Sequence, residues 1–412
     1  EDVGHSLPLN NFWWIIGAIL IGLIVGVPAA RKVEMTQMPQ LVALFNGVGG
    51  GAAALVAIVE YLNLGAEATT AEVIFTVFTV VVGCVSFSGS IITFMKLQEL
   101  MTTRPVVFPG GRFVIAGTLA AVLGTSVWVV AALGTTPLLV LAALSLLFGV
   151  LFVLPVGGAD VPIVISLLNA FTGLTVAASG YVLSSTLLII AGTLVGASGT
   201  ILTRLMAEAM GRSLFGTLFG AFTAKPQEAS GSAEERPVRS GSADDVAILL
   251  NYARRVVIVP GFGLAVAQAQ HTVRELADLM ISKGIDVAYG IHPVAGRMPG
   301  HMNVLLAEAN VPYDQLAEMD EVNPTFGQTD VAIVIGANDV VNPAAQTTPG
   351  CPIYGMPILE VNHASNIIFL KRSMRPGFAG IENELLYDPK TMLLFGDAKA
   401  SLTKVVSALK AL

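Results

Sequence analysis

The sequence predicts a bundle of about seven transmembrane helices followed by an α/β domain with a doubly wound parallel sheet. Two observations support this fold class. The 412-residue chain is 54% hydrophobic and only 12% charged, whereas soluble domains carry about 25% charge. Long apolar runs fill the first half, and short apolar runs then alternate with amphipathic segments of helical length. We expect a membrane domain over residues 1–222, a flexible linker over 223–244 and a cytoplasmic domain over 245–412.

Seven apolar runs in the first half are close to the roughly 20 residues that a membrane helix needs. With seven helices, the first seven Lys and Arg residues all fall on one face of the membrane. The excess of positive charge on the cytoplasmic side of membrane proteins then places the amino terminus outside and the second domain in the cytoplasm. The predicted spans are 12–30, 40–62, 72–97, 113–133, 137–156, 162–183 and 186–207.

Polar side chains within these spans are costly unless they are paired or functional. Asn46 lies about two turns into the second span, Asp160 opens the sixth span, and Asn169 lies nine residues further on. Interhelical hydrogen bonds would explain the asparagines, and an N-cap before Pro162 would explain Asp160. The alternative is a polar path that also includes Ser90, from a run of small residues. No Asp, Glu, Lys, Arg or His lies deep in a span, so this chain alone shows no complete proton relay.

Beyond the linker, which is rich in polar residues, Gly, Ser and Pro, strands and helices alternate as in a doubly wound, Rossmann-like sheet. The predicted strands are Val256–Val259, Asp286–Ile291, Val331–Ile335, Ile358–Val361, Ile367–Leu370 and Met392–Phe395. The predicted helices are Asp245–Tyr252, Leu264–Ser282, His301–Ala309, Tyr313–Met319 and Ser401–Leu412.

A dinucleotide fingerprint follows the first of these strands, in the order Gly261, Phe262, Gly263, Leu264, Ala265 and Val266. In such motifs the first glycine allows a tight turn, and the second lets the backbone approach a pyrophosphate. We expect Ala265 and Val266 to pack the helix against the strand, and the helix N-terminus to present free N–H groups to the phosphates. A glycine-rich turn in an unrelated α/β fold is the alternative.

The end of the second strand favours NADP over NAD. NAD sites place an acid there to bind the ribose, but this strand ends in Gly290, Ile291 and His292. After a later strand, Lys371, Arg372 and Ser373 offer two cations and a hydroxyl that suit a 2′-phosphate, although such a pair is often only a solvated edge. Arg297 could contact the pyrophosphate. The run Gly336, Ala337, Asn338 and Asp339 follows the carboxyl end of a strand, where ligands bind in such sheets. Asp339 is therefore a site candidate, with turn capping as the alternative role.

Other kinds of site are not indicated. The net charge is −7 and there is no basic run, so no nucleic-acid partner is expected. The five His residues show no metal-ligand spacing, and the two Cys residues fall in different halves of the chain. The sequence has no Ser-x-x-x-Lys pair that would mark a catalytic substrate site. A cofactor domain without a substrate site of its own indicates that a partner supplies the second reactant.

Several long segments, taken in order, resemble the β subunit of proton-translocating NAD(P) transhydrogenases over essentially the whole chain. Two of them, residues 32–36 and 157–162, lie in the membrane half. The others are residues 260–270, 290–303, 336–345, 371–374 together with 377–380, and 394–399.

The resemblance implies that NADP(H) binds this chain, in an orientation reversed from ordinary Rossmann enzymes. NAD(H) then binds a partner α subunit that has its own membrane helices, and hydride passes between the nicotinamides while a proton crosses a bacterial inner membrane. A dimer of the whole complex is expected. The implied cofactor-binding residues are Gly261 to Val266, Val294, Ala295, Gly296, Arg297, Gly336 to Asp339, Lys371 to Ser373, the covering loop Gly377, Phe378, Ala379 and Gly380, and Gly396, Asp397 and Ala398.

Within this resemblance, Asp339, with Asn338 beside it, lies near the nicotinamide and is linked to protonation, and Asp160 and Asn169 belong to the proton path. Many members carry His where this chain has Asn46, and often Tyr where it has Phe378. About two further helices usually precede the position of Glu1. Two alternatives stay open: a membrane channel or transporter that senses NAD(P) without redox chemistry, and a membrane-anchored reductase, which would need only one helix.

Overall fold

The computed structural model describes residues 11–33, 35–65, 68–103, 105–210, 236–296, 300–349, 351–377 and 379–412. The chain divides into two units, residues 1–38 and 39–412. The first unit holds helix α1 (Phe12–Lys32) and the 3-10 turn η2 (Met35–Gln37). No residue of α1 is buried, and its large apolar side chains are exposed. Such a surface suits contact with lipid.

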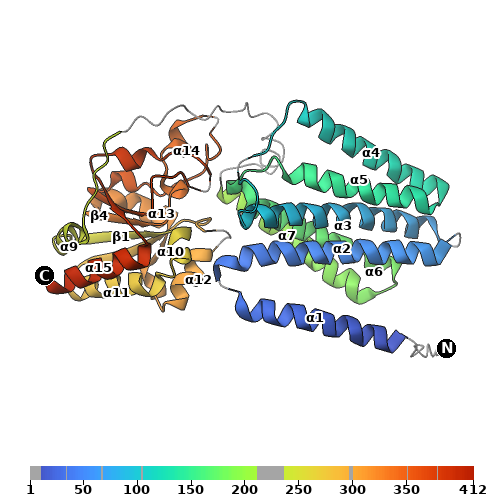
Figure 1. Ribbon diagram of the computed structural model, residues 1–412, viewed down its shortest axis with the longest axis horizontal. Coiled ribbons are helices and arrows are strands. Elements are labelled where there is room, and N and C mark those ends of the chain that lie inside the picture. The colour runs from blue at the N-terminus through green and yellow to red at the C-terminus, as the bar shows by residue number, and fades with distance from the viewer. Residues whose placement is uncertain are drawn as a thin grey trace. The chain divides into compact units, whose positions relative to one another are not determined.

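Six more long helices form a bundle, which Figure 1 shows in blue to green. The most buried of them is α3, which packs against α5 and α6, and α6 packs closely along α7. Together with α1, seven helices among the described residues are long and apolar enough to cross a membrane. The predicted number of spans is therefore confirmed. The bundle helices are α2 (Met38–Leu64), α3 (Thr70–Leu97), α4 (Gly111–Ala132), α5 (Thr135–Val153), α6 (Val161–Val182) and α7 (Thr186–Ala209), with the 3-10 turn η4 (Gly158–Asp160) before α6.

Small residues bring these helices close together. A Cβ atom added at Gly83 of α3 would lie 2.7 Å from the carbonyl oxygen of Gly50 and 3.0 Å from the Cβ of Ala54, both on α2. A Cβ added at Gly192 of α7 would lie 2.6 Å from the carbonyl oxygen of Gly173 on α6. Because larger side chains could not fit at these points, the glycines set the spacing between helices.

The second half of the chain forms a six-stranded parallel sheet in the order β3-β2-β1-β4-β5-β6. The order reverses between β1 and β4, and this is the point at which doubly wound sheets bind ligands, outside the carboxyl ends of the strands. The predicted fold class is therefore confirmed. The strands are β1 (Arg255–Pro260), β2 (Asp286–Ile291), β3 (Leu316–Glu318), β4 (Val331–Ile335), β5 (Asn366–Lys371) and β6 (Thr391–Phe395).

Two separate apolar cores cover the two faces of this sheet. Short helical segments, mostly 3-10 turns, supply one face, and α-helices, most of them longer, supply the other, where α11 buries Val273, Leu276 and Met280. These α-helices are α9 (Ala243–Asn251), α10 (Phe262–Val266), α11 (Gln270–Ser282), α12 (His301–Glu308) and α15 (Ala398–Ala411). The shorter segments include α13 (Met319–Val322), η7 (Asn323–Gln328), η9 (Val361–His363) and η10 (Glu384–Tyr387), while η6 (Tyr313–Gln315), η8 (Asp339–Val341) and α14 (Ala344–Thr347) lie in the connections.

Three predicted elements were wrong. The helix expected over Leu264–Ser282 is two helices, because Gln268 adopts a left-handed conformation (φ 49°) and the N–H of Ala269 donates back to the carbonyl of Leu264. The helix expected over Tyr313–Met319 is a 3-10 turn followed by β3, which pairs with β2. Pairing between distant segments overrode the local helical pattern in this case.

The strand expected over Ile358–Val361 lies outside the sheet. Its apolar side chains are buried, but the N–H of Leu359 donates to the carbonyl of Val340, and a 3-10 turn begins at Val361. Both edges of β4 are already paired, with β1 and β5. A short apolar run shows that a segment is buried without showing that it pairs as a strand.

The chain enters the sheet domain along β6. Ser240 forms a parallel bridge with Leu393, the N–H of Leu393 donates to the carbonyl of Arg239, and the N–H of Gly241 donates to the carbonyl of Leu393. Residues 236–242, which we call the entry segment, thus extend the sheet edge before α9 begins. Most of the predicted linker, residues 223–235, lies outside the described residues.

Candidate nucleotide site and membrane polar cluster

The loops that follow β1 and β4 are in contact at the carboxyl edge of the sheet. A Cβ added at Gly261 would lie 2.5 Å from the carbonyl oxygen of Gly336, and one at Gly263 would lie 2.7 Å from the Cα of Gly336. Gly336 itself has a φ of 65°. The glycines are needed here because the two loops pack directly on each other, a reason that the sequence pattern did not reveal.

The same packing uses N–H groups that we expected to face phosphates. The N–H of Gly261 donates to Ile335 and that of Gly263 donates to Gly336. Leu264 and Ala265 are fully buried beneath the loop, as expected for residues that pack a helix against a strand. Val266 is exposed instead, so the expected packing role belongs to Ala265 alone of that pair.

Asn338 and Asp339 connect three loops. The side chain of Asn338 donates to the Asp339 carboxylate (3.0 Å) and accepts a hydrogen bond from the Lys371 ammonium (3.1 Å). The other carboxylate oxygen of Asp339 accepts the backbone N–H of Ala379, in the predicted covering loop, at 2.8 Å. Gly377 packs so closely that an added Cβ would lie 2.4 Å from Asp339. The carboxylate therefore holds the covering loop in place.

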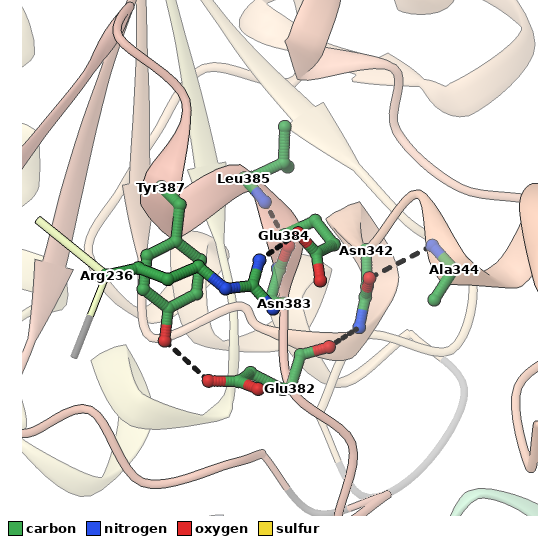
Figure 2. Close-up of polar contacts among 8 residues, drawn as sticks. All are labelled: Arg236, Asn342, Ala344, Glu382, Asn383, Glu384, Leu385 and Tyr387. Atoms are coloured by element: carbon green, nitrogen blue, oxygen red, sulfur yellow. Dashed lines mark hydrogen bonds and ion pairs between the residues drawn. The ribbon is translucent and has the colours of Figure 1, made fainter. Parts of the chain in front are cut away.

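Two buried asparagines, Asn342 and Asn383, which were not predicted from the sequence, stabilise the loop that carries Asn338 and Asp339. Figure 2 shows them beside η10: Asn383 accepts the N–H of Leu385, and Asn342 donates to the carbonyl of Glu382 at 3.0 Å. Asn383 also donates to the carbonyl of Asn338 at 2.9 Å. Each amide joins segments that are distant in the chain. Together they hold the Asn338 loop against residues 382–385.

The entry segment contacts the outer side of η10. Arg236 forms an ion pair with Glu384 at 2.7 Å and lies over the Tyr387 ring, while the Tyr387 hydroxyl donates to Glu382 (Figure 2). The bond to Glu382 raises the pKa of Tyr387 above its ordinary value. Arg236 and Glu384 are largely exposed, so water screens this ion pair.

The phosphate candidates at the end of β5 divide into two kinds. Arg372 and Ser373 are exposed, whereas Lys371 is partly buried and bonds Asn338. Burial lowers the pKa of the Lys371 ammonium below its ordinary value, and the nearby carboxylates of Asp339 and Glu382 only partly offset this effect. The loop after β6 lies alongside, because the N–H of Gly396 donates to the carbonyl of Lys371. Asp397 caps α15 by accepting the N–H of Ala400.

His292 anchors the loop after β2. It is almost fully buried, its Nε2 contacts the carbonyl of Pro357 at 2.8 Å, and its Nδ1 accepts the N–H of Val294 at 3.2 Å. These partners require a neutral ring with the proton on Nε2. Burial lowers the pKa of His292 to about 4, against the raising effect of the bond to Pro357.

Most of the predicted cofactor-binding residues line one cavity at the carboxyl edge of the sheet. Arg297 and Phe378 lie outside the described residues. Among the described residues, no group of three or more His, Cys, Asp or Glu side chains could hold a metal ion. The predicted residues that line the cavity are Gly261, Phe262, Gly263, Val266, Val294, Ala295, Gly296, Gly336, Ala337, Asn338, Asp339, Lys371, Arg372, Ser373, Gly377, Gly396, Asp397 and Ala398.

A polar cluster joins three helices inside the bundle. The Asn46 amide of α2 donates to Ser90 at 3.0 Å and to Ser86 at 3.4 Å, both on α3. The Ser86 hydroxyl in turn lies 2.6 Å from that of Thr172 on α6. Asn46 and Ser90 were predicted, whereas Ser86 and Thr172 were missed because hydroxyls are common in packed helices.

The other two predicted membrane residues are placed differently. Asp160 is buried at the start of α6, and its side chain makes no capping hydrogen bond to that helix. Asn169 is exposed on α6, so it is not part of the Asn46 cluster. A third residue, Lys96 of α3, was not predicted: it is fully buried and donates to the carbonyls of Val153, Leu154 and Val156 at 2.6 to 3.1 Å.

The fold and the site define a class: a multi-helix membrane protein that carries a doubly wound domain with a cavity at the carboxyl edge of its sheet. Comparison with known proteins identifies the family within this class. The family described as "NAD(P) transhydrogenase beta subunit" matches residues 3–408. Two relatives from Rhodospirillum rubrum, both named NAD(P) transhydrogenase subunit beta, are 48% identical over 413 residues, covering 98% of this chain and 89% of the relative. The chain therefore belongs to this family of membrane enzymes.

Proposed function

We propose that this chain binds NADP(H) in the cavity and, with an NAD(H)-binding α subunit, exchanges hydride while a proton crosses the membrane. NADH gives its hydride to NADP⁺, and one proton moves from the outer to the inner side. The observation that carries the proposal is the link between the Asp339 carboxylate and the covering loop through Ala379, at the rim of the cavity.

The cavity suits a phosphorylated dinucleotide. The 2′-phosphate needs cationic donors, and the exposed Arg372 and Ser373 supply a guanidinium fork and a hydroxyl. Lys371 contributes its charge nearby but already bonds Asn338. No acid follows β2 to repel the phosphate, and His292 is neutral and occupied by Pro357 and Val294. We therefore assign the 2′-phosphate mainly to Arg372 and Ser373.

Bound NADP(H) would supply the nicotinamide carbon that accepts or releases hydride. The residue of this chain that would control access to the cofactor is Asp339. While ionised, its carboxylate accepts the Ala379 N–H in a charge-assisted hydrogen bond, which is stronger than a neutral one. Protonation weakens that bond and releases the covering loop. Opening and closing of the cavity would thus follow the protonation of a single carboxylate.

The membrane half would deliver the proton through the Asn46 cluster and Asp160. Asn46 cannot titrate, so it can only orient hydroxyls or water, while the buried Asp160 can bind and release a proton. Asn169 is exposed on α6, where helices of the α subunit could contact it. Arg31 and Lys32 at the carboxyl end of α1 and Arg112 at the amino end of α4 support a cytoplasmic nucleotide domain. The resemblance adds a dimeric complex of the bacterial inner membrane to this proposal.

Calorimetric titration of the whole chain in detergent with NADP, NADPH and NAD tests the cofactor assignment. We expect binding of the two phosphorylated forms and at least about tenfold weaker binding of NAD, the effect of losing a charge-assisted contact. Equal binding of NAD would overturn the assignment. The complex with its α subunit, reconstituted in vesicles, should then move protons during hydride transfer. Nucleotide-gated ion flux without hydride transfer would support the channel alternative instead.

A further inference from the structure

The bundle contains buried hydroxyl groups that the Asn46 cluster does not explain. Many Ser and Thr residues of these helices donate to the carbonyl four residues earlier, as Ser145 does to Leu141 and Thr175 to Phe171. This back-bonding lets a hydroxyl sit in an apolar bundle without any other partner. Thr79 and Ser179 differ: both are buried, and among the described residues neither hydroxyl has a hydrogen-bond partner.

Thr79 and Ser179 lie at the same level of the bundle. A Cβ added at Gly83 of α3 would lie 3.2 Å from Thr175 of α6, and further along the same pair of helices the rings of Phe75 and Tyr181 are 4.3 Å apart. Thr79 lies four residues from both Gly83 and Phe75, and Ser179 lies between Thr175 and Tyr181. The two hydroxyls therefore come from facing turns of α3 and α6.

These hydroxyls are in line with the Asn46 cluster. Thr79 is seven residues from Ser86, and Ser179 is seven residues from Thr172, which corresponds to about 10 Å along each helix and nearly two full turns. Two turns return a side chain to the same face of its helix. The pair therefore faces the same seam as Ser86 and Thr172, displaced away from Asp160 toward the opposite end of the bundle.

We propose that Thr79 and Ser179 bind water and form a second polar step of the proton path, beyond the Asn46 cluster. A buried water needs two to four polar partners, and these hydroxyls with the carbonyls four residues before them can supply that number. In a relay through this water, one O–H bond breaks as another forms, so the step needs no other reactant. The inference rests on the proposed function, because it extends the same path.

Between the two steps the helices are tightly packed. A Cβ added at Gly83 would lie 2.7 Å from the carbonyl oxygen of Gly50 on α2 and 3.2 Å from the methyl carbon of Thr175 on α6, and the Thr175 hydroxyl is already bonded within its own helix. Unassisted passage of protons is hindered at this point, and such a barrier is necessary if proton movement is to be tied to hydride transfer. A third buried hydroxyl without a described partner, that of Tyr61, lies still further from Asn46, in the last turn of α2.

The test compares the reconstituted complex carrying Thr79→Val with Ser179→Ala against wild type, using a pH-sensitive dye inside vesicles. Both changes remove a hydroxyl and preserve most of the volume. The matched control carries Thr118→Val with Ser145→Ala, whose hydroxyls bond within their own helices. We expect the double variant to transport protons roughly tenfold more slowly, with NADPH affinity and the control unchanged. Two single variants, both with Ser179 intact, separate hydroxyl from packing: Thr79→Ser keeps the hydroxyl and should transport protons faster than Thr79→Val.

Two results would overturn the inference. One is proton transport by the double variant at the wild-type rate. The other is a Thr79→Ser variant as slow as Thr79→Val, because the defect would then come from packing. Failure of the proposed function looks different: the wild-type complex itself would transfer hydride without moving protons.

Discussion

The helical bundle and the nucleotide domain satisfy their buried polar side chains in different ways. In the bundle, hydroxyls such as that of Ser145 bond a carbonyl one turn away on the same helix. In the nucleotide domain, Asn342 and Asn383 bond carbonyls 40 and 45 residues away. A hydroxyl of this kind serves its own helix, whereas a single amide in the other domain holds two distant loops together.

The bundle departs from this rule where a polar side chain bonds a different helix or its end. The Asn46 amide bonds another helix, and the Lys96 ammonium bonds three carbonyls at the end of α5. Polar groups that cross between membrane helices are uncommon and are usually functional. The comparison thus separates hydroxyls that can be removed at little cost from polar groups that tie elements together.

The largest expected effect is at Asp339, where a charged cross-link holds the covering loop. Asp339→Asn keeps the shape of the side chain and removes its charge, so the bond from Ala379 is weakened. We expect hydride transfer by the complex to fall about 10- to 100-fold, as for the loss of a charge-assisted bond. Steady-state assays with purified complex measure this. Asp314→Asn, on an exposed turn, serves as the control, and normal turnover by a well-folded Asp339 variant would contradict the role.

A second prediction concerns acid, because His292 cross-links its loops only as a neutral ring. Its folded-state pKa of about 4 is below the unfolded value of about 6.5, so folding favours the neutral form. The stability is complete above about pH 6.5 and is lost as the pH falls toward 4. The loss is on the order of 3 kcal/mol. Thermal melting of wild type between pH 7 and 4 should show it.

His292→Gln offers the matched control for that prediction. The glutamine amide can both donate and accept hydrogen bonds, but it does not titrate in this range. We expect its melting temperature to depend less on pH than that of wild type. The same pH dependence in both proteins would assign the acid effect to other groups.

A third prediction compares the two regions directly. Asn383→Ala leaves the carbonyl of Asn338 and the N–H of Leu385 without their partner, at a cost of about 2 to 4 kcal/mol in stability. Ser145→Ala, equally buried, removes a bond within one helix and should cost less than about 1 kcal/mol. Thermal unfolding of each variant in the same detergent gives the comparison. Equal losses of stability would show that bonds between distant segments stabilise the protein no more than bonds within one helix.

The same difference explains how much the sequence could predict. The seven spans were predicted because membrane helices are long, apolar and satisfied within themselves. Strands β2 and β4 were predicted with their observed bounds, since buried parallel strands are continuous apolar runs. The glycines after β1 also indicated the edge where the cavity lies.

The sequence could not show features that depend on contacts between distant segments. The roles of Asn342 and Asn383 can be seen only once residues 382–387 are known to contact the Asn338 loop. The strand β3 has three residues and forms only because β2 pairs with it. Nor could the sequence show that Asn169 faces outward while Ser86 and Thr172 meet Asn46, because one polar residue per turn does not identify the face that a helix buries.

The smallest expected effect is at Arg236, a cross-link on the surface. Its ion pair with Glu384 joins the entry segment to η10, but both side chains are largely exposed, so water and salt screen their attraction. Arg236→Gln should change the melting temperature no more than Lys410→Gln, which removes a comparably exposed pair with Glu275. The two variants should also bind NADPH equally well. If Arg236→Gln alone weakens NADPH binding, the entry segment influences the Asn338 loop through η10, and a surface contact would then matter as much as the buried amides.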